Sequence, residues 1–335
     1  MTFLDWLFGS RRAAVSSVPS AAAQVELRLL VRFDDEMVWI DSLDFFGVYA
    51  KSPSGRYVLC WCDADPAGGA GGQRDKGLGT YVLYDASANA IVLQGRLERP
   101  NDGKVADSGA FCLEDWHFGQ ELSGTFYVFD VLGNPLIRRR FEANLINSAI
   151  SPLGHYAVCQ TAINQDHVDG DRMTVFDVAR GIELYSLRPT TGWAKDYRFD
   201  ESTGALAVQI EGLGSFNYDE KGIFVDAAKF DSACLHSGQF ERVFAVARKM
   251  LRSSTLDAIT AHAILASAQR LCEAGSNQES FQIAKAWRLR GETLEFLGEA
   301  ACAMEAYDQA LRLDSNVGVK RKIDALRKQF PPLES

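Results

Sequence analysis

The sequence predicts an α+β chain in which repeated β units come first and helical hairpins follow. One marker is a strand that ends in an aromatic residue and Asp, with spacings of 45 and 47 residues between its copies: Asp85, Asp130 and Asp177. A second marker is a glycine turn that leads into a strand, with spacings of 54, 45 and 50 residues: Gly55, Gly109, Gly154 and Gly204. After Phe230 the apolar period changes from that of strands to that of helices.

Length and composition allow two domains with hydrophobic cores. The chain has 335 residues, of which 47% are hydrophobic and 24% are charged, and its net charge is -9. Residues 231–335 carry 14 Lys and Arg against 13 Asp and Glu, so residues 1–230 carry 21 against 31. The acidity therefore belongs to the N-terminal part. This argues against nucleic-acid binding there, because phosphates require a basic face.

Residues 1–23 form a short apolar segment and a linker. Phe3, Leu4, Trp6, Leu7 and Phe8 could make a short amphipathic anchor for a membrane or a partner, within the segment Met1–Arg12. The alternative is a short helix docked on its own domain or frayed in solution. The apolar stretch is too short for a signal-peptide core, and no run approaches the ~20 residues of a membrane-spanning helix. Similar openings are common in bacterial cytoplasmic proteins.

Residues 24–230 are predicted to form the β domain. Val25–Ile40 alternates around an acidic turn and predicts a hairpin. Four units of about 45–50 residues follow, each with short strands and Gly-rich turns, and their period matches that of propeller blades. Tyr218-Asp219 is a faint echo of the first marker at the end of the fourth unit.

The repeated unit resembles a WD40-type β-propeller blade, although the Trp-Asp and Gly-His signatures are absent. The resemblance implies a propeller-like domain of about four blades. A closed ring, an open fan capped by the helices and a fifth sheet completed by the hairpin all stay open. A plain β-sandwich is the alternative to a propeller.

Residues 231–335 are predicted to form the helical domain, and Ala284–Ser315 is its clearest part. Small residues occupy positions where two helices must touch: Gly291, Ala303 and Ala310. Large residues fill the space between them: Trp287, Leu294, Leu297, Tyr307 and Leu311. Gly298 separates the two halves, which predicts a helix, a tight turn and a second helix. A degenerate hairpin with its turn at Leu235–Phe240 precedes this unit, and a basic helix over Val317–Phe330 follows it.

The Ala284–Ser315 unit resembles a tetratricopeptide (TPR) repeat. In that family the first helix of each repeat lines a concave groove that holds peptides. By position, the resemblance implies that the groove residues here are Lys285, Arg288, Glu292 and Glu295. Their mixed charge leaves a second interpretation open, in which this helix face is solvated or packs on the β domain.

No constellation of residues indicates catalysis, and neither a cofactor nor a metal is expected. Glu114, Asp115 and His117 place two acids beside a histidine, but acid, base and nucleophile need a shared cleft. The loop Asp166–Asp171 has alternating carboxylates without the spacing of a calcium loop, so a solvated hairpin tip is expected. The loop Asp63–Lys76 is Gly-rich and expected to be flexible, and it lacks the spacing of a phosphate cradle.

The seven cysteines are scattered and odd in number. They predict reduced, mostly buried thiols in a cytoplasmic protein. Cys60 and Cys62 are two residues apart in a predicted strand, so both should point to the same face.

We therefore expect a non-catalytic interaction or scaffold protein that binds a protein or peptide. The two kinds of repeat and the absence of a catalytic constellation support this expectation, and self-association is a further possibility. One alternative is a hydrolase-type enzyme with its site in the β domain. The other is a peripheral membrane adaptor that uses Met1–Arg12.

Overall fold

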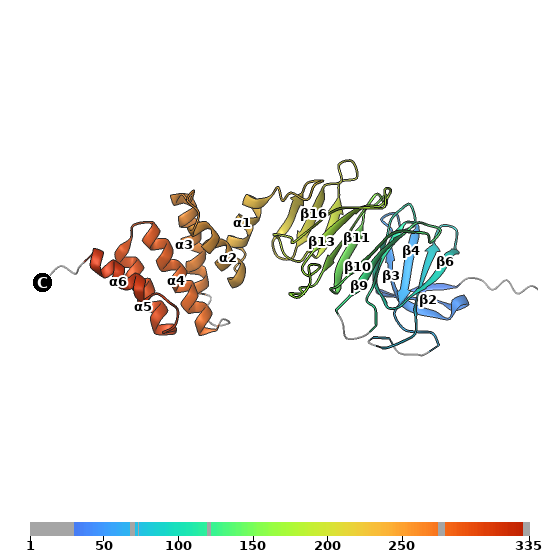
Figure 1. Ribbon diagram of the computed structural model, residues 1–335, viewed down its shortest axis with the longest axis horizontal. Coiled ribbons are helices and arrows are strands. Elements are labelled where there is room, and N and C mark those ends of the chain that lie inside the picture. The colour runs from blue at the N-terminus through green and yellow to red at the C-terminus, as the bar shows by residue number, and fades with distance from the viewer. Residues whose placement is uncertain (1–29, 68–70, 73, 119–121, 274–278, 331–335) are drawn as a thin grey trace, which may run out of the picture.

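A row of four antiparallel sheets with six helices at one end makes up the chain (Figure 1). This computed structural model describes residues 30–67, 71–72, 74–118, 122–273 and 279–330. The arrangement confirms the predicted α+β layout. It also shows that the β-sandwich alternative is wrong, because the strands form four sheets in place of two.

Each sheet follows the chain in order. The first sheet contains β1 (Val31–Phe33), β2 (Met37–Ile40), β3 (Phe45–Lys51), β4 (Tyr57–Cys62), β5 (Gly79–Asp85) and β6 (Ala90–Leu97). The second contains β7 (Pro100–Val105), β8 (Phe111–Asp115), β9 (Gly124–Phe129) and β10 (Pro135–Phe141). The third contains β11 (Leu145–Ile150), β12 (Tyr156–Thr161), β13 (Met173–Asp177) and β14 (Ile182–Leu187). The fourth contains β15 (Asp196–Phe199), β16 (Leu206–Ile210) and β17 (Gly214–Tyr218).

The aromatic-Asp marker corresponds to a capped turn. The carboxylate of Asp130 accepts hydrogen bonds from the backbone N–H groups of Leu132 and Asn134, both at 2.8 Å. Three other carboxylates accept bonds from backbone N–H groups in the same way: Asp85, Asp177 and Asp219. Such Asx turns reverse the chain locally. The pair Tyr218-Asp219 is therefore a full member of the repeat.

The glycine marker corresponds to the turn between two strands of one sheet, and it also ties neighbouring sheets together. Its glycines have φ between 74° and 84°, a left-handed backbone that favours glycine: Gly55, Gly109, Gly154 and Gly204. The carboxylate of Asp107 in the second sheet accepts a bond from the Ser54 N–H of the first at 2.8 Å. Glu201 in the fourth sheet accepts one from the Leu153 N–H of the third at 2.6 Å.

The β1–β2 hairpin joins the first sheet, so the alternative in which it completes a fifth sheet is wrong. The reason is that β2 pairs with the free edge of β3. The ring of Phe33 then reaches Tyr49 and Tyr84, with centroid distances of 4.9 and 6.5 Å, so β1 folds across one face of the sheet. Val38 and Ile40 are fully buried there. Val25, Leu27 and Leu29 lie outside the described residues.

The core lies between consecutive sheets. Leu59 and Leu83 of the first sheet pack with Phe111 and Leu113 of the second, and all four are fully buried. The opposite face of the first sheet carries Cys60 and Cys62, which confirms their predicted common face. Burial raises the pKa of Cys60 to about 12. The first and fourth sheets lie at opposite ends of the row (Figure 1), so the ring is open and β1–β2 covers one end.

The fourth sheet has three strands, and a short segment before the helices closes its free edge. The Asn217 N–H donates to the Asp226 carboxylate at 2.9 Å, and the Asn217 carbonyl accepts from the Val225 N–H at 3.0 Å. The Ser215 carbonyl accepts from Lys229 Nζ at 2.7 Å. These contacts satisfy backbone groups that a fourth strand would otherwise pair.

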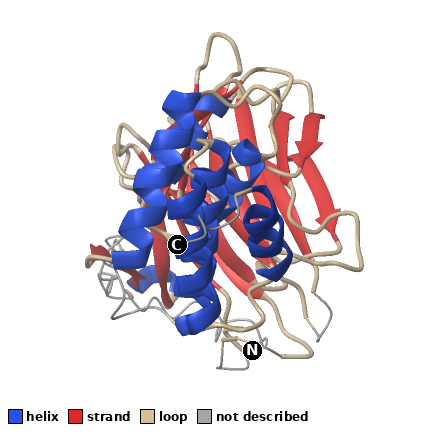
Figure 2. Ribbon diagram, turned by 90° about the vertical axis from the view of Figure 1, so that its left-hand side faces the viewer, coloured by secondary structure: helices blue, strands red, loops and turns tan. Residues whose placement is uncertain are grey.

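The helices are stacked beyond the fourth sheet, and Figure 2 shows them in front of the strands. They are α1 (Ala227–His236), α2 (Phe240–Leu251), α3 (Ala258–Glu273), α4 (Ser280–Phe296), α5 (Ala300–Leu313) and α6 (Lys320–Gln329). Val208 and Phe216 of the fourth sheet share one core with Phe230 and Val243 of α1 and α2. The helices therefore cover the second end of the row.

The α4–α5 hairpin matches the pattern predicted for Ala284–Ser315. Gly298 has a φ of 81° and reverses the chain between the two helices. Tyr307 is fully buried against α4. Among the described helices, none is both long enough and apolar enough to cross a membrane.

Candidate functional site

A groove between α2, α4 and α6 forms a cavity of about 340 Å³. Its walls mix apolar and charged side chains: Arg248, Leu251, Arg252, Glu292, Glu295, Phe296 and Lys322. Leu251 and Phe296 supply the apolar part, and Phe296 is 47% exposed. The groove can therefore offer both an apolar contact and charge to a bound segment.

The carboxylate of Glu295 is neutralised within the groove. It accepts a hydrogen bond from the Tyr307 hydroxyl at 2.6 Å and one from Lys322 Nζ at 3.0 Å. Partial burial raises the pKa of Glu295, but these two bonds outweigh it and hold the pKa below its usual value. Glu295 thus remains ionised and fully engaged with α5 and α6.

Glu292 and Arg288 form a second internal pair. Arg288 Nε donates to Glu292 Oε1 at 2.9 Å, and Arg288 Nη1 donates to the Val317 carbonyl at 2.8 Å. The guanidinium therefore joins α4 to the turn that precedes α6. In this position Arg288 braces the last helix, and two of its N–H groups are already used within the chain.

The positive charge left in the groove comes from the end of α2. Arg248 lies over the ring of Phe244 with 5.5 Å between the guanidinium carbon and the ring centroid. Among the described residues, neither Arg248 nor Arg252 has a carboxylate within ion-pair distance. Cations are favoured near the C-terminus of a helix, so the sequence tolerates them there without a partner. The groove can thus attract an anionic group.

The four residues implied by the TPR resemblance have different positions. Glu292 and Glu295 line the cavity, and Arg288 borders it through its pair with Glu292. Lys285 is not part of the lining; its Nζ lies 5.0 Å from the ring centroid of Phe281. Their role in peptide binding stays a prediction.

Sequence reasoning did not select Arg248, Arg252 and Lys322. Arg248 lies in the last turn of α2 and Arg252 is the C-cap residue four positions later, which places them on one helix face. This spacing is the one sign in the sequence that the two arginines act together. It does not show that their helix face lies beside α4.

No protein-family model and no curated protein matches the chain. Among solved structures, the computationally designed Ika4 protein is 12% identical, with 51% of this chain and 88% of that chain covered and a TM-score of 0.35. The β-propeller domain of Myceliophteria thermophila Cps50 (Swd1) is 13% identical, with 57% and 64% covered and a TM-score of 0.32. Sqt1 from Chaetomium thermophilum is 15% identical, with 52% and 43% covered and a TM-score of 0.36.

The chain thus spans less than two thirds of the Cps50 domain and less than half of Sqt1. Likenesses of this size assign neither a family nor a function to the chain.

The two acids of the second sheet cannot both face the neighbouring His117. Glu114 and Asp115 are consecutive in β8, so their side chains point to opposite faces. Asp115 accepts a bond from the Arg99 N–H at 2.7 Å. The ring nitrogens of His117 lie 3.1 Å from Ser123 Oγ and 2.8 Å from Thr125 Oγ1. Asp115 and His117 are thus both engaged in local hydrogen bonds, which gives no support to a hydrolase site.

Glu114 is buried between the second and third sheets, with 1% of its surface exposed. Burial raises its pKa to about 7, and the nearby Asp102 carboxylate adds to this effect. The hydrogen bond that Trp116 Nε1 donates to Glu114 Oε2 at 3.3 Å, the nearby Ser148 hydroxyl and the charge of Lys104 act in the opposite direction. Glu114 Oε1 has no hydrogen-bond partner among the described residues. This buried acid is a cost to stability and lies away from the described cavities.

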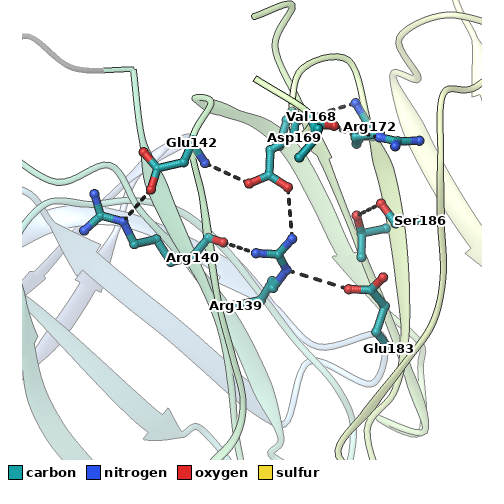
Figure 3. A network of polar contacts seen from close by, with 10 residues as sticks. Arg139, Arg140, Glu142, Val168, Asp169, Arg172, Glu183 and Ser186 are labelled. Carbon is teal, nitrogen blue, oxygen red and sulfur yellow. Dashed lines mark hydrogen bonds and ion pairs between the residues drawn. The ribbon is translucent and has the colours of Figure 1, made fainter. Parts of the chain in front are cut away.

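Arginines hold two of the carboxylates of the Asp166–Asp171 loop, and Figure 3 shows the one at Asp169. Asp169 accepts bonds from Arg139 at 2.9 Å and from the Glu142 N–H at 3.0 Å. Arg139 Nε also lies 3.7 Å from Glu183 on β14, so the network links the second and third sheets. Asp171 pairs with Arg188 at 3.2 Å. Within the described ranges, no group of three or more His, Cys, Asp or Glu residues could hold a metal ion.

Hydrogen bonds to Asp63 and Glu98 hold the described part of the Asp63–Lys76 loop in place. The Asp63 carboxylate accepts a bond from the Gly72 N–H at 2.8 Å. Arg74 donates to the Asp63 carbonyl and, at 2.7 Å, to the Glu98 carbonyl. These bonds give the loop a structural role where the sequence suggested only flexibility.

Proposed function

We propose that this chain is a non-catalytic interaction protein that binds an extended segment of a partner protein between α2, α4 and α6. The observation that carries the proposal is the uneven charge of the groove. Glu292 and Glu295 are neutralised within the chain, whereas Arg248 and Arg252 are not. The favoured ligand therefore carries carboxylates.

The apolar wall defines the second requirement of the ligand. Leu251 and Phe296 offer a surface for one apolar side chain next to the two arginines. A segment with an apolar residue near acidic residues satisfies both requirements, in the manner of peptides that bind helical grooves. On this proposal the helices act as TPR-like hairpins, and the sheets act as a propeller-like scaffold.

A peptide-display selection against the full chain tests the proposal. We expect enrichment of acidic segments that bind the wild-type chain and lose at least 10-fold in affinity for the double variant Arg248→Glu, Arg252→Glu. Fluorescence anisotropy with synthetic versions of the enriched segments gives the dissociation constants.

A matched control makes the same change of charge elsewhere. Arg321 and Arg327 are exposed on α6 and do not line the groove. The variant Arg321→Glu, Arg327→Glu should keep binding. Equal losses in both variants would show that only net charge matters, and a selection without acidic enrichment would refute the proposal.

A further inference from the structure

A second cavity, of about 390 Å³, lies where the sheets meet the helices. The loop Thr190–Gly192 forms one side of it, and α1 and α2 form the other. We call this site the junction cavity. Helix α2 therefore lines both the junction cavity and the groove that it forms with α4 and α6.

The junction cavity borders the groove along α2. Ala245 and Lys249 line the junction cavity, whereas Arg248 and Arg252 line the groove. Each arginine follows one of the cavity residues by three positions, and residues three apart are neighbours on a helix surface. Ala245 is exposed, and its short side chain leaves room above the helix. A bound segment can therefore pass over α2 from one site to the other.

The floor of the junction cavity is apolar. Phe230, Cys234 and Val246 line it and are buried. Gly192 lines it without a side chain, and a β-carbon placed there would meet no atom within 4 Å. An apolar cavity of ~150 Å³ is enough to hold a benzene ring. The junction cavity therefore has room for an aromatic side chain.

The charged residues that line the junction cavity balance one another. Asp231 and Glu241 carry negative charges, and Arg242 and Lys249 carry positive ones. Lys249 Nζ lies 2.7 Å from the Asp231 carboxylate. Arg242 donates to the Glu211 carbonyl at 3.1 Å and keeps its positive charge next to Glu241. The junction cavity thus favours an uncharged side chain, in contrast to the groove, which favours an anionic group.

We propose that one partner segment occupies both sites: its acidic residues bind in the groove, and an aromatic side chain of the same segment fills the junction cavity. The inference rests on the proposed function and specifies the chemistry of the partner more closely. A helix with its side chains is ~10–12 Å wide, so three or four extended residues of ~3.3 Å each cross it. The aromatic residue therefore stands about four positions from the acidic ones.

Linking the two contacts strengthens binding without any change in the groove. Once the acidic residues are bound, the aromatic side chain is held near the junction cavity at a high effective concentration. Aromatic anchors in well-packed pockets dominate the affinity of many interfaces. A segment with the aromatic residue at the right spacing should therefore bind more tightly than one with the acidic residues alone.

Two synthetic peptides test the inference on the full chain. The first has the sequence Trp-Ser-Gly-Ser-Asp-Leu-Asp-Glu, and the second has serine in place of the tryptophan. Both carry fluorescein, both are also made with the reverse order of residues, and anisotropy gives the dissociation constants. In at least one order, the tryptophan peptide should bind the wild-type chain at least 5-fold more tightly than the serine peptide. Deleting the Ser-Gly-Ser spacer should remove this advantage.

Substitutions on two sides of the junction cavity locate the aromatic side chain. Thr190 is exposed on the loop, so Thr190→Trp should fill the cavity from the side away from the groove. In this variant the tryptophan peptide should lose its advantage, whereas the serine peptide should keep its wild-type affinity. Ala245→Trp should also remove the advantage, from the side of α2. Ala301→Trp, at an exposed position of α5, is the matched control and should change neither affinity.

The outcomes distinguish this inference from the proposed function. Two peptides that bind the wild-type chain equally, and that both weaken in the Arg248→Glu, Arg252→Glu variant, would leave the groove as the binding site and overturn the inference. A tryptophan advantage that persists in both the Thr190→Trp and Ala245→Trp variants would overturn it as well. Peptides that do not bind, or that bind the arginine double variant as well as the wild-type chain, would refute the proposed function and this inference with it.

Discussion

Gly291 of α4 lies directly against the ring of Tyr307 of α5: a β-carbon at residue 291 would lie 2.5 Å from Tyr307 Cε1. Gly→Ala inside a helix usually stabilises a protein, by about 1 kcal/mol. At this contact we expect the opposite sign. Gly291→Ala should lower the free energy of unfolding by about 1–3 kcal/mol, because the two helices must move apart. Urea unfolding followed by circular dichroism measures the change.

A double-mutant cycle identifies the Tyr307 ring as the cause. In a Tyr307→Leu background the close contact is gone, so Gly291→Ala should cost less there than in the wild-type chain. Equal costs in the two backgrounds would mean that the ring does not limit the helix spacing.

Arg288 connects α4 with the turn before α6, through Glu292 and the Val317 carbonyl. Arg288→Ala should destabilise the end of the helical stack by about 1–3 kcal/mol, because a carbonyl loses a charged donor. Hydrogen exchange of residues 317–329 should rise. As a control, Arg321→Ala removes an exposed arginine of α6 and should leave the hydrogen exchange unchanged. Similar exchange in the Arg288→Ala and Arg321→Ala variants would contradict the bracing role of Arg288.

Glu114 should make stability depend on pH. The native state keeps its proton up to a pKa of about 7, whereas the unfolded chain releases it near 4.5, the usual pKa of a glutamate. Between these values the native state binds more protons, so the free energy of unfolding falls as the pH rises. At about 1.4 kcal/mol per pH unit, the free energy of unfolding should fall by roughly 3 kcal/mol between the two pKa values.

The variant Glu114→Gln should remove most of this slope. Urea unfolding at several values between pH 5 and pH 8 gives the comparison with the wild-type chain. Glu241→Gln changes an exposed acid and should keep the wild-type slope. A Glu114→Gln chain with an unchanged slope would show that another group is responsible.

Gly222 combines a left-handed backbone with a close contact to the third sheet. Its φ is 80°, and a β-carbon there would lie 2.8 Å from side-chain atoms of Tyr185 and Leu187. Gly222→Ala should therefore cost about 2–4 kcal/mol in thermal or urea unfolding. Gly212 has a φ of 73° but more room, with Gln239 at 3.5 Å. Gly212→Ala should therefore cost only about 1–2 kcal/mol. If Gly222→Ala and Gly212→Ala cost the same, the contact of residue 222 with Tyr185 and Leu187 contributes nothing.

Local signals in the sequence were enough to predict the repeat. Asp130 and its equivalents cap their own turns, and the turn glycines need a backbone that few other residues adopt. The period of the apolar residues then separates strands from helices. These features depend on neighbours in the chain, so they can be found without knowing which elements meet in space.

Contacts between distant segments were harder to predict. The pairing of β2 with β3 and the roll of β1 over the first sheet depend on which edge is free. The groove shows the same division. Helical spacing alone is enough to place Glu292 and Glu295 on one face of α4. Arg248 and Arg252 line the same groove only because α2 lies beside α4, which the spacing does not show.

The β1–β2 hairpin and the helices α1 and α2 cover the two ends of the row of sheets, so the number of sheets between them can vary. A closed ring fixes the number of its sheets, since each one must turn through its share of a full circle. In the described part of this row the main contacts join consecutive sheets, and the β1–β2 hairpin and the α1–α2 pair protect the outer faces. A unit of one sheet could therefore be gained or lost between the second and third sheets without straining a ring.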